Sequence, residues 1–262
     1  MQKNAWTYSL AGAVLGTFGL LLRWLQCQII FDETGLPVKN AAVSWLLVAF
    51  IAVMTAVLWW LSGRMEAQNV SAEPEEAMAD ATREAKLLLA LGAAAILLGS
   101  GVMFLRMDET VFRIAALAGL LSAPVMLLYP SLNRWGGFGA GLSVLPVAFF
   151  SLWMISFYKT NAVNPIVWTY AVEILAIAGC LLAAYRCSAF LFYRAEPRKS
   201  IFGCALATAF SLMVLMDNIS LGERIMFAGW AICFGTLCWI VLHSAAPGKE
   251  ETQPVQIAGN DK

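Results

Sequence analysis

Apolar residues occur in blocks of about twenty along the chain, and short polar segments separate these blocks. As an α-helix, a block of this length spans the hydrocarbon core of a bilayer, which is about 30 Å thick. The pattern therefore predicts an all-α, polytopic membrane protein with a bundle of eight transmembrane helices. Their approximate ranges are 6–25, 42–62, 86–106, 112–131, 138–157, 165–187, 200–217 and 223–243.

The polar segments set the domain organisation. The longest connection, 63–85, is acidic, and the stretch from 244 to 262 is polar without an apolar period. Such a stretch cannot bury enough apolar surface to order itself. The sequence thus predicts a single transmembrane domain over 1–243 and a disordered cytoplasmic tail over 244–262.

The distribution of Lys and Arg predicts the orientation. Eleven of them lie on the side of the predicted bundle that holds both termini, and six lie on the other side. Cytoplasmic loops carry the excess of positive charge in membrane proteins. We therefore expect both termini in the cytoplasm and place the protein in the cell membrane as a multi-pass protein.

Three similar acidic turns lie on the predicted extracytoplasmic side, namely "FDETG" at 31–35, "MDETV" at 107–111 and "MDNIS" at 216–220. One interpretation is helix capping, and Ser220 with Glu223 has the spacing of a capping box. The alternative is a cation site such as a calcium site, which requires six or more converging oxygens. We favour capping, because these residues satisfy helix ends without a ligand.

The sequence similarity between 107–119 and 216–229 also raises the possibility that the chain arose by internal duplication. Two parallel four-helix halves, about 1–131 and 138–243, would have the same orientation, as in parallel-repeat transporters. Capped hairpins resemble one another without duplication, so this alternative stays open.

Glu173 is the most informative charged residue. It lies eight positions after Pro165, which is about 12 Å into a helix that begins there. A carboxylate at this depth is costly unless it is protonated, paired or hydrated. Small residues along its face of the helix indicate that it points into the bundle.

Three further residues complete the candidate binding site. Arg23 and Arg106 end the first and third predicted helices on the same side as Glu173, and either could pair with it. Asp217 is a further partner for an arginine. The set is either a buried ion pair that fixes helix packing or a polar pocket with Glu173 as ligand for a substrate or proton.

Two residue patterns predict how the helices lie and pack. Nearly all tryptophans lie near the ends of predicted spans, where an indole occupies the headgroup boundary; Trp230 is the exception. Gly12 with Gly16, and Gly137 with Gly141, have the small-xxx-small spacing of helix contacts.

Composition removes several function classes. The chain is 60% hydrophobic and 13% charged with zero net charge, so no basic face indicates nucleic acid. His243 is the single histidine, and the six cysteines include no CxxC pair. The sequence indicates no metal site and no cofactor, and it has no motif of an intramembrane enzyme.

The hypothesis that remains is a non-enzymatic membrane protein embedded in the lipid bilayer. Transport of a small solute or ion through an outward-facing polar pocket fits the spans and Glu173. The alternative is a sensor, regulator or assembly subunit that acts with a membrane or cytoplasmic protein partner.

Overall fold

The structure is a computed structural model that describes residues 3–30, 42–65, 81–106, 110–162, 166–194 and 196–243. The turn predicted at 31–35, residues 107–109 of the turn predicted at 107–111, most of the acidic connection and the tail at 244–262 lie outside the described residues.

Every regular element among the described residues is helical, which confirms the all-α prediction. The long helices are α1 (Lys3–Ile30), α2 (Ala42–Met65), α4 (Arg83–Arg106), α5 (Thr110–Leu128), α7 (Leu145–Asn161), α8 (Ala171–Leu191), α9 (Pro197–Met213) and α10 (Leu221–His243). Shorter elements are η2 (Tyr129–Trp135), α6 (Gly136–Leu142), η3 (Val167–Thr169) and η4 (Val214–Met216).

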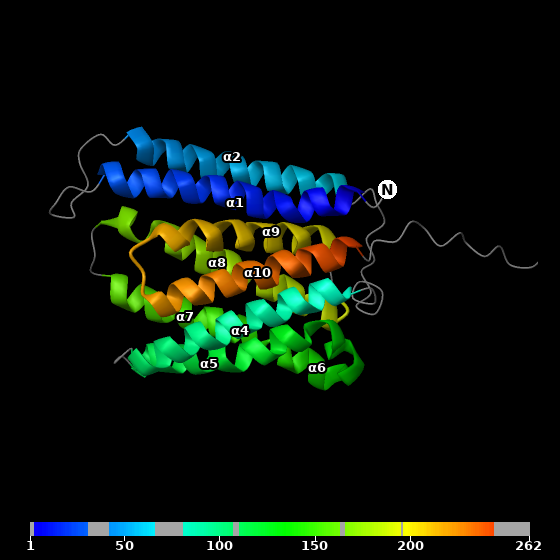
Figure 1. Cartoon of the computed structure of the whole chain (residues 1–262). Helices are drawn as coiled ribbons and strands as arrows, with labels where there is room; N and C mark the ends of the chain where they lie inside the picture. Colours follow the sequence, from blue (N-terminus) through cyan, green and yellow to red (C-terminus); the bar gives the residue numbers. More distant parts are fainter. Residues whose placement is uncertain are drawn as a thin grey trace, which may run out of the picture.

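Seven helical stretches in the described part of the chain are long and apolar enough to cross a membrane. The fourth of them, Thr110–Asn161, extends over 52 residues and includes α5, η2, α6 and α7. In Figure 1 the chain reverses at η2 and α6, so that α5 and α7 run side by side in opposite directions.

The long helices lie lengthwise beside one another, and the start of α1 and the end of α10 are at the same end of the bundle (Figure 1). α9 and α10 form the centre, with 72% and 78% of their spanning windows buried. α2 packs on α1 at the edge and is only 22% buried, so the α1–α2 pair is the most peripheral part of the bundle.

Glycines bring two pairs of helices close together. A Cβ on Gly99 of α4 would stand 2.6 Å from the carbonyl oxygen of Gly222 of α10, and one on Gly16 of α1 would stand 2.7 Å from Ala209 Cα of α9. A Cβ on Gly12 would meet the Ala205 carbonyl. The predicted contact face at Gly12 and Gly16 is therefore confirmed, since small residues let membrane helices approach.

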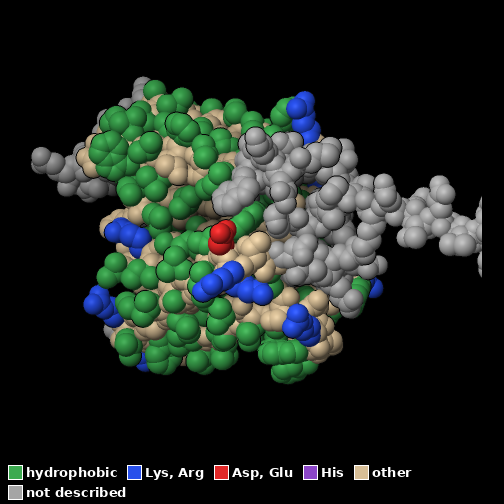
Figure 2. Space-filling view, turned by 45° about the vertical axis from the view of Figure 1, so that its right-hand side comes forward, with side chains coloured by type: hydrophobic (Ala, Val, Ile, Leu, Met, Phe, Trp, Pro, Cys, Tyr) green, Lys and Arg blue, Asp and Glu red, His purple; other side chains and the backbone are tan. Residues whose placement is uncertain are grey.

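Large apolar side chains cover the outside of the bundle. Val53 of α2, Leu98 of α4 and Leu121 of α5 are each more than half exposed, although each lies well inside a long helix. Figure 2 shows hydrophobic side chains over most of the described surface in that view, with few charged side chains between them. This surface suits a lipid environment and supports an integral membrane protein.

The structure corrects three interpretations of the fifth predicted span. α7 begins at Leu145 and not at 138, because Pro146 is in its first turn and cannot continue the preceding helix. No described atom lies within 4 Å of a Cβ added at Gly137 or Gly141, so these glycines do not form the predicted close contact face. Trp153 is not at a boundary: it is fully buried, with its ring 4.7 Å from that of Phe227.

Candidate functional site

Buried polar groups gather at the end of the bundle where α1 ends and α10 begins, which we call the Asp217 end. Asp217 follows η4 in the short connection between α9 and α10. Within the described part of the chain, the buried charged side chains are Arg23, Glu173, Asp217 and Glu223. The hydrogen bonds and charge interactions of these four place all of them at the Asp217 end.

Arg23, near the end of α1, makes three of the hydrogen bonds in this region and is only 1% exposed. Its Nε donates to Asp217 Oδ1 at 2.5 Å, its Nη1 to Gln26 Oε1 at 2.5 Å, and its Nη2 to the carbonyl oxygen of Trp168 at 3.0 Å. Gln26 Nε2 in turn donates to Ser44 Oγ of α2 at 3.0 Å. One guanidinium thus ties α1 and α2 to the turn before α8 and to the connection after α9.

Asp217 is the buried anion that this guanidinium requires. Burial raises the pKa of Asp217 above its ordinary value, while the charge of Arg23 and its hydrogen bond act in the opposite direction. Arg224 Nη2 donates to the backbone carbonyl of Asp217 at 3.0 Å. Asp217 Oδ2 is buried and has no hydrogen-bond partner among the described residues, so one oxygen of the carboxylate is unused.

Glu173 lies in the first turn of α8 and is 6% exposed. The predicted depth was wrong, because Val167–Thr169 form a separate 3-10 turn and α8 begins only at Ala171. Glu173 is therefore the third residue of its helix and faces the positive end of the helix dipole, which favours an anion.

Neither predicted arginine pairs with Glu173. Arg23 pairs with Asp217, and Arg106 is exposed at the end of α4 and makes no ion pair within the described part of the chain. The charges that act on Glu173 come from Glu223 and Asp217, so its charged neighbours are carboxyl groups. The structure thus brings Glu173, Asp217 and Arg23 to one end of the bundle but leaves Arg106 out of their contacts.

Glu223 completes the Asp217 end and closes the start of α10. Its Oε2 accepts the backbone N–H of Ser220 at 2.8 Å, and its own N–H donates to Ser220 Oγ at 3.3 Å. The predicted capping box is therefore confirmed. Sequence reasoning gave Glu223 only this capping role; at 8% exposed, it also belongs to the buried charged set.

Three buried carboxyl groups thus share this end of the bundle with one buried guanidinium. No group of three or more His, Cys, Asp or Glu side chains in the described ranges has the geometry to hold a metal ion. Extra carboxylates in a low-dielectric site need a proton or another cation for charge balance.

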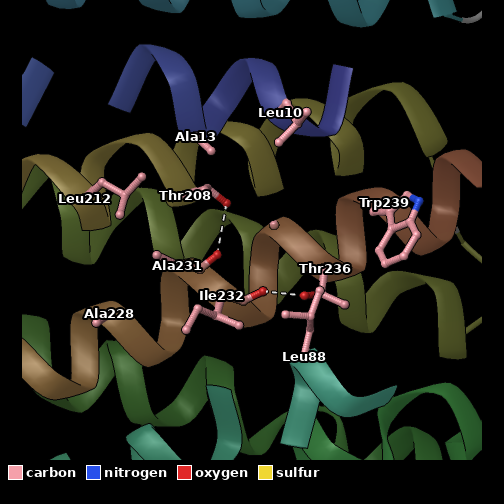
Figure 3. Close-up of a pocket in the computed structure, with 11 residues that line it drawn as sticks. Leu10, Ala13, Leu88, Thr208, Leu212, Ala228, Ala231, Ile232, Thr236 and Trp239 are labelled. Carbon is pink, nitrogen blue, oxygen red and sulfur yellow. Dashed lines mark hydrogen bonds between the residues drawn. The ribbon is translucent and has the colours of Figure 1, made fainter. Parts of the chain in front are cut away.

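An apolar groove lies elsewhere, with residues of α1, α4, α9 and α10 around it (Figure 3). Its volume is about 350 Å³. Thr208 Oγ1 donates to the Cys204 carbonyl at 2.8 Å, and Thr236 Oγ1 donates to the Ile232 carbonyl at 2.7 Å. Both hydroxyls are used by the backbone and no charged residue lines the groove, so it is distinct from the polar pocket expected at Glu173.

Gln26 and Ser44 were missed by sequence reasoning, as was the Trp168 carbonyl. Gln26 follows Arg23 by one helical turn, so their contact is a local signal that the sequence does contain. The partner across 194 positions, Asp217, cannot be chosen over Glu173 from the sequence alone.

No family model matches this chain, and comparison with curated proteins and with solved structures finds no match.

Proposed function

We propose that this chain is a non-enzymatic protein of the cell membrane that crosses the bilayer eight times, with both termini in the cytoplasm. Its Asp217 end then faces the extracytoplasmic side. The protein transports a small cation or cationic solute, with the proton as the simplest candidate, and Glu173 is the residue that receives it.

Eight crossings follow when α5 and α7 each span the membrane. The two helices have 19 and 17 residues, about 29 and 26 Å at 1.5 Å per residue, close to the thickness of a bilayer core. An even number of crossings agrees with the start of α1 and the end of α10 lying at one end (Figure 1). The excess of Lys and Arg on that side supports a cytoplasmic location.

The observation that carries the transport proposal is the charge environment of Glu173. It is 94% buried, its charged neighbours are the carboxyl groups of Glu223 and Asp217, and the buried guanidinium of Arg23 is bonded to Asp217. A proton or cation at Glu173 relieves the repulsion among the three carboxyls. Intramembrane carboxyl groups of this kind mark proton and ion pathways in membrane proteins.

One observation favours a second function, that of an assembly or regulatory subunit. The Arg23 network is a closed structural connection that fixes the peripheral α1–α2 pair to the core. A purely structural role of the Asp217 end would need no ligand, and the exposed α1–α2 pair would then be the surface for a protein partner in the membrane.

Cation flux into proteoliposomes tests the proposal. Full-length protein is reconstituted into vesicles that contain a pH-sensitive dye, a potential is imposed, and proton entry is recorded; sodium and potassium entry are measured with tracers. We expect one of these cations to enter faster than in protein-free vesicles. Glu173→Gln should reduce that rate at least tenfold, because a glutamine amide has no negative charge and cannot take up a proton.

The matched control is Glu84→Gln. Glu84 is exposed in the first turn of α4, at the opposite end of the bundle, so its loss should leave the flux unchanged. Equal entry of all three cations with and without protein contradicts transport of these cations. In that case co-purification of a stoichiometric membrane partner, lost when α2 surface residues are changed, supports the assembly function.

A further inference from the structure

Two cysteines from facing helices lie against each other inside the bundle. Cys187 of α8 and Cys204 of α9 have their Sγ atoms 3.4 Å apart, and the residues are only 4% and 2% exposed. They are 17 positions apart without a CxxC spacing, so the sequence does not indicate the pair. We propose that Cys187 and Cys204 form an oxidisable dithiol that closes to a disulfide between α8 and α9.

Small residues bring the two helices close together beside the cysteine pair. A Cβ on Gly203, next to Cys204, would lie 3.4 Å from Ala183 Cα, and one on Gly179 would lie 3.6 Å from Ala207 Cα. A disulfide requires Cα atoms about 4.4–6.8 Å apart and Cβ atoms about 3.5–4.5 Å apart. The two Sγ atoms are 3.4 Å apart, so they must approach each other by about 1.4 Å to reach the bonding distance of about 2.05 Å.

The surroundings of the pair separate it from the other buried cysteines. Cys180 bonds to the Ser211 hydroxyl, whereas Cys187 and Cys204 lie near enough to the Tyr129 hydroxyl to influence it electrostatically. This hydroxyl is buried and has no hydrogen-bond partner in the described part of the chain. We expect this neutral hydroxyl beside the pair to assist oxidation, because a nearby donor favours the thiolate, which is the form that reacts.

The oxidant that suits this location is a lipid-soluble two-electron acceptor of the quinone class, because the thiols are buried in an apolar bundle. The two S–H bonds break and one S–S bond forms. The two electrons and two protons pass to the quinone oxygens and give a quinol. The product joins the helix that carries Glu173 to the helix that leads to Asp217, so oxidation would restrict movement between them.

Mass-tagging of free thiols tests the dithiol in the full-length protein. Membranes are treated with a short-chain quinone or with diamide, the protein is unfolded in detergent, and each remaining thiol receives a polymer–maleimide tag. The six cysteines give six tags when reduced. We expect oxidation to remove two tags from the wild type. Cys187→Ser and Cys204→Ser should start at five tags and lose none.

Cys233→Ser is the matched control, since Cys233 is equally buried on α10 but is not part of the pair. It should start at five tags and still lose two. Tyr129→Phe should slow the loss without abolishing it. Peptide mapping of the oxidised wild type, which depends on no variant, should find Cys187 linked to Cys204. Retention of six tags, or a loss of two tags that persists in Cys187→Ser, overturns the proposal.

Discussion

Arg23 and Asp217 form a buried ion pair across 194 positions of the chain, with Nε and Oδ1 2.5 Å apart. Both side chains are almost fully removed from solvent. The pair connects α1, which lies near the edge of the bundle, to the connection between the two most buried helices. Gln26 and Ser44 extend the connection to α2, so the peripheral helix pair is held by polar contacts at this end.

The ion pair should behave as a coupled unit in a double-mutant cycle. We expect Arg23→Gln and Asp217→Asn each to lower the free energy of unfolding by about 3–5 kcal/mol, because each leaves the partner's charge buried and uncompensated. The double variant should lose clearly less than the sum of the two. Denaturant unfolding of protein in lipid nanodiscs measures all three, and strictly additive losses would show that the two charges do not interact.

Glu173→Gln should alter cation flux more than Glu223→Gln. The Glu223 carboxylate accepts the Ser220 N–H, and a glutamine amide oxygen can accept the same hydrogen bond, as capping boxes with Gln do. Among the described residues, the charges that act on Glu173 are those of the Glu223 and Asp217 carboxyl groups, so Glu173→Gln removes one carboxyl of this group. Flux and thermal stability of both variants give the comparison, and equal, negligible effects remove Glu173 from the site.

The approach of α4 to α10 predicts a difference between two Gly→Ala substitutions. A Cβ on Gly99 would stand 2.7 Å from the Met226 backbone nitrogen, so α4 and α10 would have to separate. A Cβ on Gly235, beside the apolar groove, meets its nearest atom, Thr208 Oγ1, at 3.5 Å, an ordinary contact.

Overpacking of this kind costs about 1–3 kcal/mol, and both substitutions have the same effect on helix propensity. We therefore expect Gly99→Ala to lower the melting temperature and Gly235→Ala to leave it unchanged or raise it. Similar melting temperatures for the two variants would mean that the tight α4–α10 contact is not present.

Glu196, between α8 and α9, gives a pH dependence with a defined sign. The hydrogen bond from Lys199, and then the charges of Lys199 and Arg186, lower the pKa of Glu196 below its ordinary value. A lowered pKa in the folded state means that the ionised form stabilises the protein at neutral pH. This stability is lost as the pH falls through the folded-state pKa.

We expect Glu196→Gln to melt slightly below the wild type at pH 7, since Glu196 and its partners are exposed or partly exposed and water screens such pairs. The difference should close as the pH falls below about 4.3, the ordinary pKa of Glu. A difference that persists or grows in acid would contradict this assignment.

Local signals in the sequence predicted the structure well. The blocks of apolar residues located the long helices, because length and hydropathy suffice for that. Ser220 and Glu223 are three positions apart, so their capping box depended on no distant residue. Gly12 and Gly16 were placed correctly because the α1–α9 contact is built from small residues on both sides.

Features that depend on contacts between distant parts of the chain could not be predicted from the sequence. The sequence offered Arg23 two carboxyl partners, and only the packing of α1 against η4 selects Asp217 over Glu173. The start of α8 depends on a 3-10 turn at Val167–Thr169, which moved Glu173 from the predicted depth to the first helical turn. By sequence, Trp153 could lie at the membrane boundary or in the protein core. Its contact with the aromatic ring of Phe227 on α10 shows that it lies in the core.

Site-directed labelling on either side of α7 tests the proposed topology most directly. Gly137 and Ala162 are both exposed, and they flank α7 on opposite sides. A cysteine is placed at either position in a Cys27→Ser background, and intact cells are treated with a membrane-impermeant maleimide. We predict that Ala162→Cys is labelled from outside, and that Gly137→Cys is labelled only after the cells are permeabilised. Labelling of both positions from the same side would contradict eight crossings and an outward-facing Asp217 end.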